Sequence, residues 1–308
     1  MRAAGAATRI AESDVSAGGW APLASLVPPT LLRYLGRFEL LNPLQAQAVP
    51  TVLSTHGHVM VVAPTSSGKT LIGEAAALRA IVTEGRPAVW LLPARALAAE
   101  VAAITRRWHA LGIATVELTG ETNMSSDAVR RAQLWVATTE KFEALHRRSS
   151  LQDFIGRIGC LIVDEVHLVG DAARGATLES LLARLRVAGG GTRIVALSAT
   201  VSNADELAAW LGAELVRSAW RPTSLTTELV PYDVPARGTR EDAESAKDDV
   251  LLALLRRLLG VGATGARGVD TAFDGSAANP GASGSAVVFC GSKAAVVRTA
   301  ARVAGVSY

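Results

Sequence analysis

The sequence predicts a doubly wound α/β domain built on a central parallel sheet. Short apolar runs recur between residues 58 and 229, and each is nearly continuous, which is typical of strands buried on both faces of a sheet. The segments between them, such as Leu71–Val82 and Ala94–Leu111, carry apolar residues at helical spacing. Strands that alternate with helices in this way favour a parallel sheet. The predicted strands are Val59–Ala63, Ala88–Leu92, Leu134–Ala137, Cys160–Val163 and Ile194–Leu197.

Three regions are expected along the chain. Residues 1–24 are predicted to be a flexible N-terminal segment, because Ala, Gly and Ser dominate its first part. Residues 25–232 are predicted to form the α/β domain. Residues 233–308 change in texture and are predicted to hold a linker, an insertion rich in Gly, Ala and Ser, and the beginning of a second α/β domain.

The last region is short for a domain. A helix is expected over Glu244–Leu259, a flexible insertion over residues 260–285, a buried strand over Ala286–Cys290 and a helix over residues 292–304. One strand and two helices rarely hold a core alone. We therefore expect the chain to be cut short within this second domain.

The bulk composition is that of an ordinary globular protein. With 49% hydrophobic and 19% charged residues, the chain has enough apolar material for a sizeable core. The formal net charge of +3 neither requires nor excludes a nucleic-acid partner. Cys160 and Cys290 are far apart and have no metal-ligand spacing, which favours a reducing compartment. Because we find neither a signal peptide nor a run long enough to span a membrane, we expect a cytoplasmic protein without a membrane partner.

The strongest local signal is a phosphate-binding loop. Thr65, Ser66, Ser67, Gly68, Lys69 and Thr70 follow a predicted strand and open a predicted helix. Backbone N–H groups of such a loop and the helix N-terminus form a cavity that favours anions. We expect Lys69 to approach the β- and γ-phosphates of ATP, and the Thr70 hydroxyl to bind Mg²⁺. Ala63 stands where the general pattern has its first glycine.

Two adjacent carboxylates form the second signal. Asp164 and Glu165 follow the apolar run Cys160–Val163, so they are expected at the carboxyl edge of the sheet, where ligands bind in open α/β folds. Asp164 is a candidate Mg²⁺ ligand. Glu165 is then placed to orient or deprotonate the water that attacks the γ-phosphate. Alone, the pair could be a solvated strand end, but the phosphate loop makes a shared nucleotide site the better interpretation.

These motifs together resemble those of the superfamily 2 DExH-box helicases. The loop at 63–70 and the segment Asp164-Glu165-Val166-His167 are accompanied by Ser198-Ala199-Thr200. Leu41-Asn42-Pro43-Leu44-Gln45 resembles the glutamine motif of that family. The segment 170–179 is similar to the branch with exosome-associated RNA helicases, archaeal repair helicases and the helicase part of polymerase theta, and Trp220-Arg221-Pro222 also suits that branch.

The resemblance implies a fold and a set of roles. It implies a RecA-like (P-loop NTPase) domain over 25–232 and the start of a second RecA-like domain after it. Gln45 would contact the adenine edge of ATP, with Phe38 or Leu41 against the ring. His167 would couple the carboxylate loop to the second domain. By resemblance, the family's arginine fingers would lie beyond Tyr308, so the chain alone is expected to bind ATP weakly and hydrolyse it poorly.

Three loops are expected, by the same resemblance, to hold one strand of nucleic acid by its phosphates. Arg95 and Lys141 supply positive charge, while Thr hydroxyls and backbone N–H groups can donate to phosphate oxygens. Such contacts carry no base sequence information. Ser292 or Lys293, in the second-domain fragment, would add a further phosphate contact. The candidate residues in the first domain are Pro93, Arg95, Thr119, Gly120, Thr138 and Lys141.

Ser198 and Thr200 have two interpretations that are compatible. Their hydroxyls can hydrogen-bond the Asp-Glu loop and so link the ATP state to domain closure. Alternatively, the segment simply leads into the helix over Ala204–Leu211, with Ser202 or Asn203 as its N-cap.

The leading functional hypothesis is an ATP-dependent helicase or translocase that moves along single-stranded or partly duplex DNA or RNA, 3′ to 5′ by family resemblance. Its partners would be the nucleic acid and the remainder of a larger helicase. Two alternatives stay open: a phosphate-loop kinase or other small-molecule NTPase, and a non-catalytic nucleic-acid-binding fragment. The first has no use for phosphate-gripping loops, and the intact Lys69, Thr70, Asp164 and Glu165 disfavour the second.

Overall fold

The computed structural model describes residues 8–11, 19–120, 126–147, 151–172, 174–187, 191–223, 226–233, 238–258, 287–290 and 292–304. It divides into two compact units. Ser13–Leu225 form the first, and Met1–Glu12 with Thr226–Tyr308 form the second. These limits differ from the predicted domain limits of 25 and 232, because residues before 25 pack into the first unit and a strand before 232 belongs to the second.

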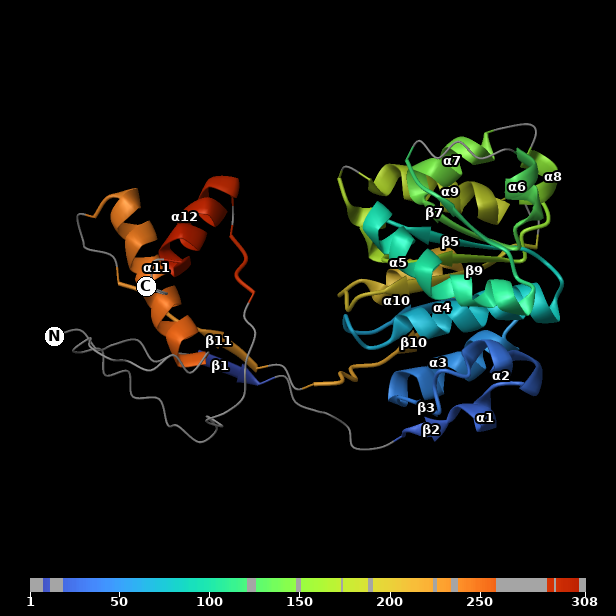
Figure 1. Ribbon diagram of the computed structural model, residues 1–308, viewed down its shortest axis with the longest axis horizontal. Coiled ribbons are helices and arrows are strands. Elements are labelled where there is room, and N and C mark those ends of the chain that lie inside the picture. The colour runs from blue at the N-terminus through green and yellow to red at the C-terminus, as the bar shows by residue number, and fades with distance from the viewer. Residues whose placement is uncertain are drawn as a thin grey trace. The chain divides into compact units, whose positions relative to one another are not determined.

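A parallel sheet of seven strands organises the first unit (Figure 1). The strand order is β10-β4-β9-β8-β5-β7-β6, and every neighbouring pair is parallel. All five predicted strands are confirmed, each within one residue at either end. The strands are β4 (His58–Val62), β5 (Ala88–Leu92), β6 (Thr115–Leu118), β7 (Leu134–Thr138), β8 (Cys160–Val163), β9 (Arg193–Ser198) and β10 (Ala213–Arg217).

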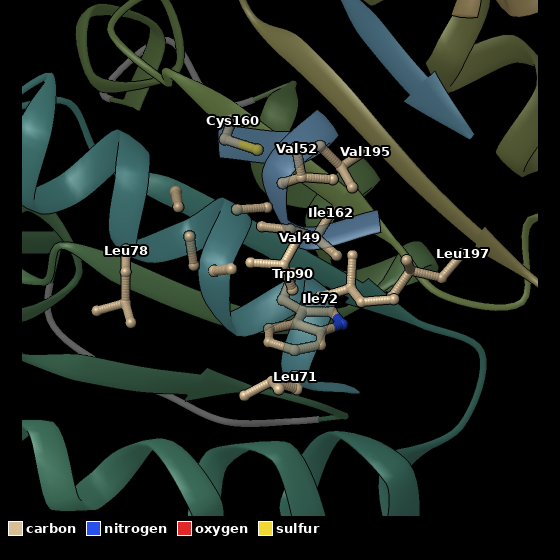
Figure 2. Packing of buried hydrophobic residues seen from close by; sticks show 14 of the residues in the cluster. Val49, Val52, Leu71, Ile72, Leu78, Trp90, Cys160, Ile162, Val195 and Leu197 are labelled. Atoms are coloured by element: carbon tan, nitrogen blue, oxygen red, sulfur yellow. The ribbon is translucent and has the colours of Figure 1, made fainter. Parts of the chain in front are cut away.

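One face of the sheet packs against the helices that precede residue 112. Side chains at alternate strand positions, such as Trp90, Ile162 and Val195, meet Val49 and Ile72 from the helices, as Figure 2 shows. Alternation of this kind follows from the two-residue repeat of a strand. The helices on this face are α2 (Pro29–Leu35), α3 (Pro43–Ser54), α4 (Lys69–Leu78) and α5 (Arg95–Thr105).

The opposite face packs against the later helices. The intervening strand positions, among them Trp135, point to this side, where the indole ring stacks on Phe154 with ring centroids 4.1 Å apart. The two-sided burial confirms the predicted doubly wound RecA-like fold. The helices are α6 (Ser126–Arg131), α7 (Thr139–His146), α8 (Gln152–Ile155), α9 (Gly175–Val187) and α10 (Ala204–Leu211).

Helix α4, which follows the phosphate loop, lies unusually close to the sheet. A Cβ atom on Gly73 would come within 2.5 Å of the Trp90 ring. Both residues are fully buried or nearly so, and the ring occupies the space that a side chain would take. The predicted helix Leu71–Val82 is confirmed, but its last turn is the π-helix η1 (Arg79–Thr83). The predicted helix Ala94–Leu111 likewise ends in the 3₁₀ helix η2 (Arg106–Leu111).

Residues 19–24 of the expected flexible segment contain secondary structure and pack on the first unit. β2 (Ala21–Pro22) pairs antiparallel with β3 (Leu40–Leu41), and α1 (Leu23–Leu26) follows it. Trp20 meets Trp220 edge to face, with centroids 5.9 Å apart. These contacts begin before residue 25, so the expectation of flexibility does not hold for residues 19–24.

The second unit contains a two-stranded sheet and two helices. β1 (Thr8–Ala11) pairs antiparallel with β11 (Thr226–Leu229), so this part of the expected tail is also a strand. α11 (Arg240–Leu258) and α12 (Lys293–Ala304) occupy the two predicted helical segments. They are joined by ion pairs of Arg298 and Arg302 with acidic side chains of α11. We find no helix that could span a membrane in the part of the chain that the structure describes.

The predicted strand over Ala286–Cys290 is wrong for the part that is described. Residues 287–290 adopt no strand, and Phe289 is 93% exposed. A strand needs a neighbour to satisfy its backbone groups, and no described strand of this unit pairs with the segment. Ala286 and the predicted insertion over 260–285 lie outside the described residues.

Candidate functional site

The phosphate loop connects the end of β4 to the first turn of α4. Ser66 (φ 62°) and Gly68 (φ 87°) are both left-handed, so the loop turns its backbone sharply just before the helix N-terminus. The Lys69 amine donates hydrogen bonds to the carbonyl oxygens of Ala63 at 3.0 Å and Pro64 at 2.9 Å. The amine thus folds back across the loop, where the phosphates of a nucleotide are expected to lie.

Lys69 also faces the acid pair. Burial lowers the pKa of Lys69, and the negative charges of Glu165 and Asp164 oppose that shift. The amine is almost fully enclosed, so its charge is balanced by carboxylates and loop carbonyls rather than by water. The structure therefore brings Lys69, Asp164 and Glu165 to one edge of the sheet.

Asn42 and Gln45 support the loop from behind. Asn42 is the N-cap of α3, and the two residues form a capping box in which each side chain accepts from the other's backbone N–H. Their side-chain amides then donate to the loop carbonyls, Asn42 to Ser67 at 2.9 Å and Gln45 to Gly68 at 3.1 Å. The Gln45 amide lies against the phosphate loop, and its expected contact with adenine stays a prediction. Asn42 was missed, although an Asn followed by Gln three residues later is a capping signature.

The acid pair extends the edge of β8. The backbone N–H of Asp164 donates to the carbonyl oxygen of Leu91 at 2.9 Å, which continues the pairing with β5. The Asp164 carboxylate accepts from the Glu165 N–H at 3.0 Å. Burial, and next the charge of Glu165, raise the pKa of Asp164 to about 6, although the Glu165 N–H and Lys69 act in the opposite direction. A carboxyl with this pKa is ionised at neutral pH but close to taking up a proton.

Glu165 has a strained backbone and an unsatisfied oxygen. Its φ of 53° is left-handed, which is uncommon for a residue with a side chain. Its Oε2 lies 3.3 Å from Nδ1 of His167, yet the geometry is not that of a hydrogen bond, and the oxygen has no hydrogen-bond partner among the residues that the structure describes. A buried oxygen left in this state is available to a water molecule or a ligand.

His167 connects the acid pair to the end of β9. Its Nδ1 lies 3.3 Å from the Ser198 hydroxyl as well as from Glu165. The carbonyl oxygen of Ser198 in turn accepts from the backbone N–H of Ala63 at 3.2 Å, at the start of the phosphate loop. The expected contact of Ser198 with the carboxylate loop is therefore made through His167. Thr200 is exposed. Asn203 occupies the N-cap of α10, but its side chain makes no capping hydrogen bond.

The oxygens offered for a metal ion are few. Thr70 is half-buried in the first turn of α4, and Asp164 faces the same loop through its interaction with Lys69. Among the described residues there is no cluster of three or more His, Cys, Asp or Glu side chains that could bind a metal. A hydroxyl and one carboxylate suit Mg²⁺, which keeps several waters and takes its other ligands from phosphates.

The candidate nucleic-acid loops follow β5, β6 and β7, which are neighbours in the sheet. They meet at Gly120, whose carbonyl oxygen accepts from the Lys141 amine at 2.8 Å. A Cβ on Gly120 would come within 2.8 Å of the Arg95 guanidinium, so that group lies directly against the glycine. The φ of 52° also favours glycine at this position. The structure therefore brings the charged groups of the first and third loops together over the second.

The threonines of these loops have local roles. The Thr138 hydroxyl caps α7 by accepting from the Lys141 N–H, at 3.4 Å. The Thr119 hydroxyl donates to Glu117 at 3.3 Å. Pro93 is half-buried beside exposed Arg95. The six candidates of the first unit therefore share one region of the carboxyl edge.

Ser292 lies in the second unit. Its exposed hydroxyl accepts from the backbone N–H of Ala295 at 3.1 Å and so caps α12. This contact accounts for Ser292 locally, and its expected contact with phosphate stays a prediction.

Comparison with known proteins identifies relatives that match most of this chain. ATP-dependent DNA helicase Hel308 of Pyrococcus abyssi is 38% identical over 195 residues, which cover 63% of this chain and 26% of the relative. Hel308 of Caldivirga maquilingensis is 32% identical over 284 residues, which cover 92% of this chain and 34% of the relative. The chain thus spans about a quarter to a third of the length of these relatives.

Solved structures agree on the fold. The crystal structure of the DUF1998 helicase MrfA bound to DNA has a TM-score of 0.65 and 18% sequence identity, and the match covers 82% of this chain and 38% of that one. The model of the DEAD/DEAH box helicase family matches residues 42–207. This range begins at the capping box beside the phosphate loop, includes the acid pair and ends within α10. The chain belongs to the DEAD/DEAH box helicase family.

Proposed function

We propose that this chain is the nucleotide-binding part of an ATP-dependent helicase or translocase that moves along single-stranded nucleic acid. The observation that carries the proposal is the meeting of Lys69, Asp164 and Glu165 at the carboxyl edge of one sheet, next to the loops around Gly120. A small-molecule kinase would need Lys69, Asp164 and Glu165 but would have no use for the loops around Gly120.

Mg²⁺-bound ATP, as the cofactor, would supply the phosphoryl group whose transfer to water releases free energy. Lys69 would exchange its two loop carbonyls for phosphate oxygens, and Thr70 and Asp164 would hold the ion. Glu165, with one oxygen unsatisfied, is suited to orient the attacking water and accept its proton. His167 and Ser198 would pass the state of Glu165 to β9.

The nucleic-acid site would be formed by Pro93, Arg95, Thr119, Gly120, Thr138 and Lys141. Because Arg95 and Lys141 are held against one glycine, their charges are concentrated where a backbone phosphate could bind. DNA is the favoured substrate, since the Hel308 relatives are DNA helicases and MrfA is a DNA-bound helicase. The proposal also includes a phosphate contact by Ser292 and the remainder of a larger helicase as a partner. It further includes 3′ to 5′ movement and a cytoplasmic location. Two free cysteines, one buried, support the location.

The decisive experiment measures ATP hydrolysis by the full-length protein with and without matched single-stranded DNA and RNA. Stimulation by an oligonucleotide is expected, and it should be larger with DNA. Lys69→Ala should abolish hydrolysis by weakening nucleotide binding. Glu165→Gln keeps the size of the side chain but removes the base, so the stimulated rate should fall about a hundredfold or more while oligonucleotide binding remains.

Two outcomes would contradict the proposal. Stimulated hydrolysis that survives in Glu165→Gln would remove the assigned base. ATP hydrolysis that no oligonucleotide stimulates would favour a small-molecule NTPase. So would the failure of every oligonucleotide to compete for binding to the protein. Circular dichroism and urea unfolding of each variant serve as folding controls.

A further inference from the structure

An unbroken series of hydrogen bonds leaves the acid pair through the short helix η4 (Val166–Gly170). The carbonyl oxygen of Glu165 accepts from the N–H of Leu168 at 2.9 Å, and that of Leu168 accepts from Asp171 at 2.9 Å. Asp171 then holds the start of α9, because its carbonyl oxygen accepts from Gly175 at 2.8 Å. Its carboxylate also accepts from the N–H of Arg174 at 2.9 Å. These hydrogen bonds connect Glu165 to Arg174 without a gap.

Close backbone packing makes this connection stiff. A Cβ on Gly175 would lie 2.1 Å from the carbonyl oxygen of Val169, much nearer than any side chain allows. The glycine thus lets the first turn of α9 rest directly on η4. No side chain therefore separates the backbones of the two helices at this point.

The Arg174 side chain carries the connection to a different loop. Its Nη1 donates to the carbonyl oxygen of Pro93 at 3.1 Å, although the two residues are 81 positions apart. Pro93 directly follows β5 and lies two residues before Arg95. Arg174 therefore joins the loop after the acid pair to the first of the proposed nucleic-acid loops.

We propose that Arg174 is a positioning residue that couples the nucleotide site to the nucleic-acid loop at Pro93. The inference rests on the proposed function and deepens it by naming how the two sites communicate. A change in the position of Glu165 and η4 on nucleotide binding would be passed through Arg174 to the Pro93 carbonyl, and so to the phosphate-binding surface beside Arg95. Coupling of this kind appears as a change in affinity for one ligand when the other is bound.

The test measures binding of a labelled single-stranded oligothymidylate to the full-length protein by fluorescence anisotropy. Each titration is done with and without a saturating non-hydrolysable ATP analogue and Mg²⁺. The quantity of interest is the ratio of the two dissociation constants. In Arg174→Ala the ratio is expected to move toward one by about fivefold, the lower end of the usual range of coupling between two sites, because Arg174 is exposed.

Two further variants test whether the coupling depends on the length of the Arg174 side chain or only on its positive charge. Arg174→Lys keeps the charge but ends one bond short of Nη1, so it should lose the coupling as the alanine variant does. Arg106→Ala removes an equal charge from an exposed residue at the start of η2, directly after α5, and should keep the coupling. The affinity of all three variants for the ATP analogue alone is expected to stay within about twofold of the wild type.

Each result decides between distinct explanations. If Arg174→Ala weakens oligonucleotide binding equally with and without nucleotide, and its salt dependence falls by about one phosphate contact, then Arg174 binds the backbone directly and the inference is overturned. If Arg174→Lys keeps the wild-type ratio of the two dissociation constants, the inference is overturned as well. If the wild type binds no oligonucleotide, the proposed function fails first, whatever Arg174 does.

Discussion

Glu74 lies on α4, the helix that follows the phosphate loop, and its carboxylate is completely shielded from solvent. Two arginines hold it by short ion pairs: Arg37, which follows α2, and Arg107, which lies in η2. Their side chains are 35% and 29% exposed, so each reaches from the surface to the buried carboxylate. We predict that replacing both arginines with methionine, which keeps much of the apolar stem, will destabilise the first unit substantially.

The magnitude follows from the burial. A buried charge that loses its partner costs about 3–5 kcal/mol, whereas the arginines themselves can turn to water. Burial raises the pKa of Glu74, and the charges of Arg107 and Arg37 oppose this. In the double variant only the burial effect remains, so the folded-state pKa rises further above the unfolded value. The loss of stability is then full above the folded pKa and disappears as the pH falls toward the unfolded pKa.

Urea unfolding followed by tryptophan fluorescence between pH 5 and pH 8 measures the effect. We expect a loss of about 3–5 kcal/mol at pH 8 that shrinks at pH 5. A third substitution, Glu74→Leu, should restore most of the stability at pH 8, because an apolar residue needs no partner. A loss below about 1 kcal/mol, typical of a surface pair, would refute the reasoning. So would a loss that does not change with pH.

Two further predictions concern the nucleotide site. The Asp164 carboxyl must be ionised to hold Mg²⁺, and its pKa is raised to about 6. The affinity of the protein for Mg²⁺ with ATP should therefore fall about tenfold per pH unit below that value. Calorimetry from pH 5 to pH 8 should show this fall in the wild type but not in Asp164→Asn. An affinity unchanged down to pH 5 would speak against Asp164 as a ligand. Gly68→Ala should weaken nucleotide binding about tenfold, since φ is 87° and the new Cβ would lie 2.5 Å from the Gln45 amide. Gly85→Ala is the matched control, with a φ of 65° and nothing within 4 Å, so it should lose stability but not affinity.

The central strands could be predicted from the sequence because each is buried on both faces. Such strands leave an almost continuous apolar run, and the polar residues that follow must then gather at one edge of the sheet. Asp164 was predicted from this rule and Lys69 from the phosphate-loop motif, and the structure brings them together. Edge strands leave a weaker pattern. In β10 only Val216 is buried, so its alternating polar residues did not mark it as a strand.

Other features depend on contacts that no local pattern specifies. An apolar run shows that residues suit a sheet, but the segment around Phe289 lacks a described neighbour to pair with. The direction of the Gln45 amide follows from the approach of α3 to the phosphate loop, and the contact between Arg174 and Pro93 joins distant segments. Such contacts are set by tertiary packing rather than by spacing along the chain.

The contact between Gly73 and Trp90 has a consequence for how the phosphate loop is held. Because the indole ring of Trp90 occupies the place that a side chain on Gly73 would take, that ring limits how closely α4 approaches β5 at this point. The packing of Gly73 on Trp90 therefore helps to set the position of the N-terminus of α4, which would face the nucleotide. Substitution of Gly73 by a residue with a larger side chain would therefore tilt the N-terminus of α4, although Gly73 is not among the residues proposed to bind ATP.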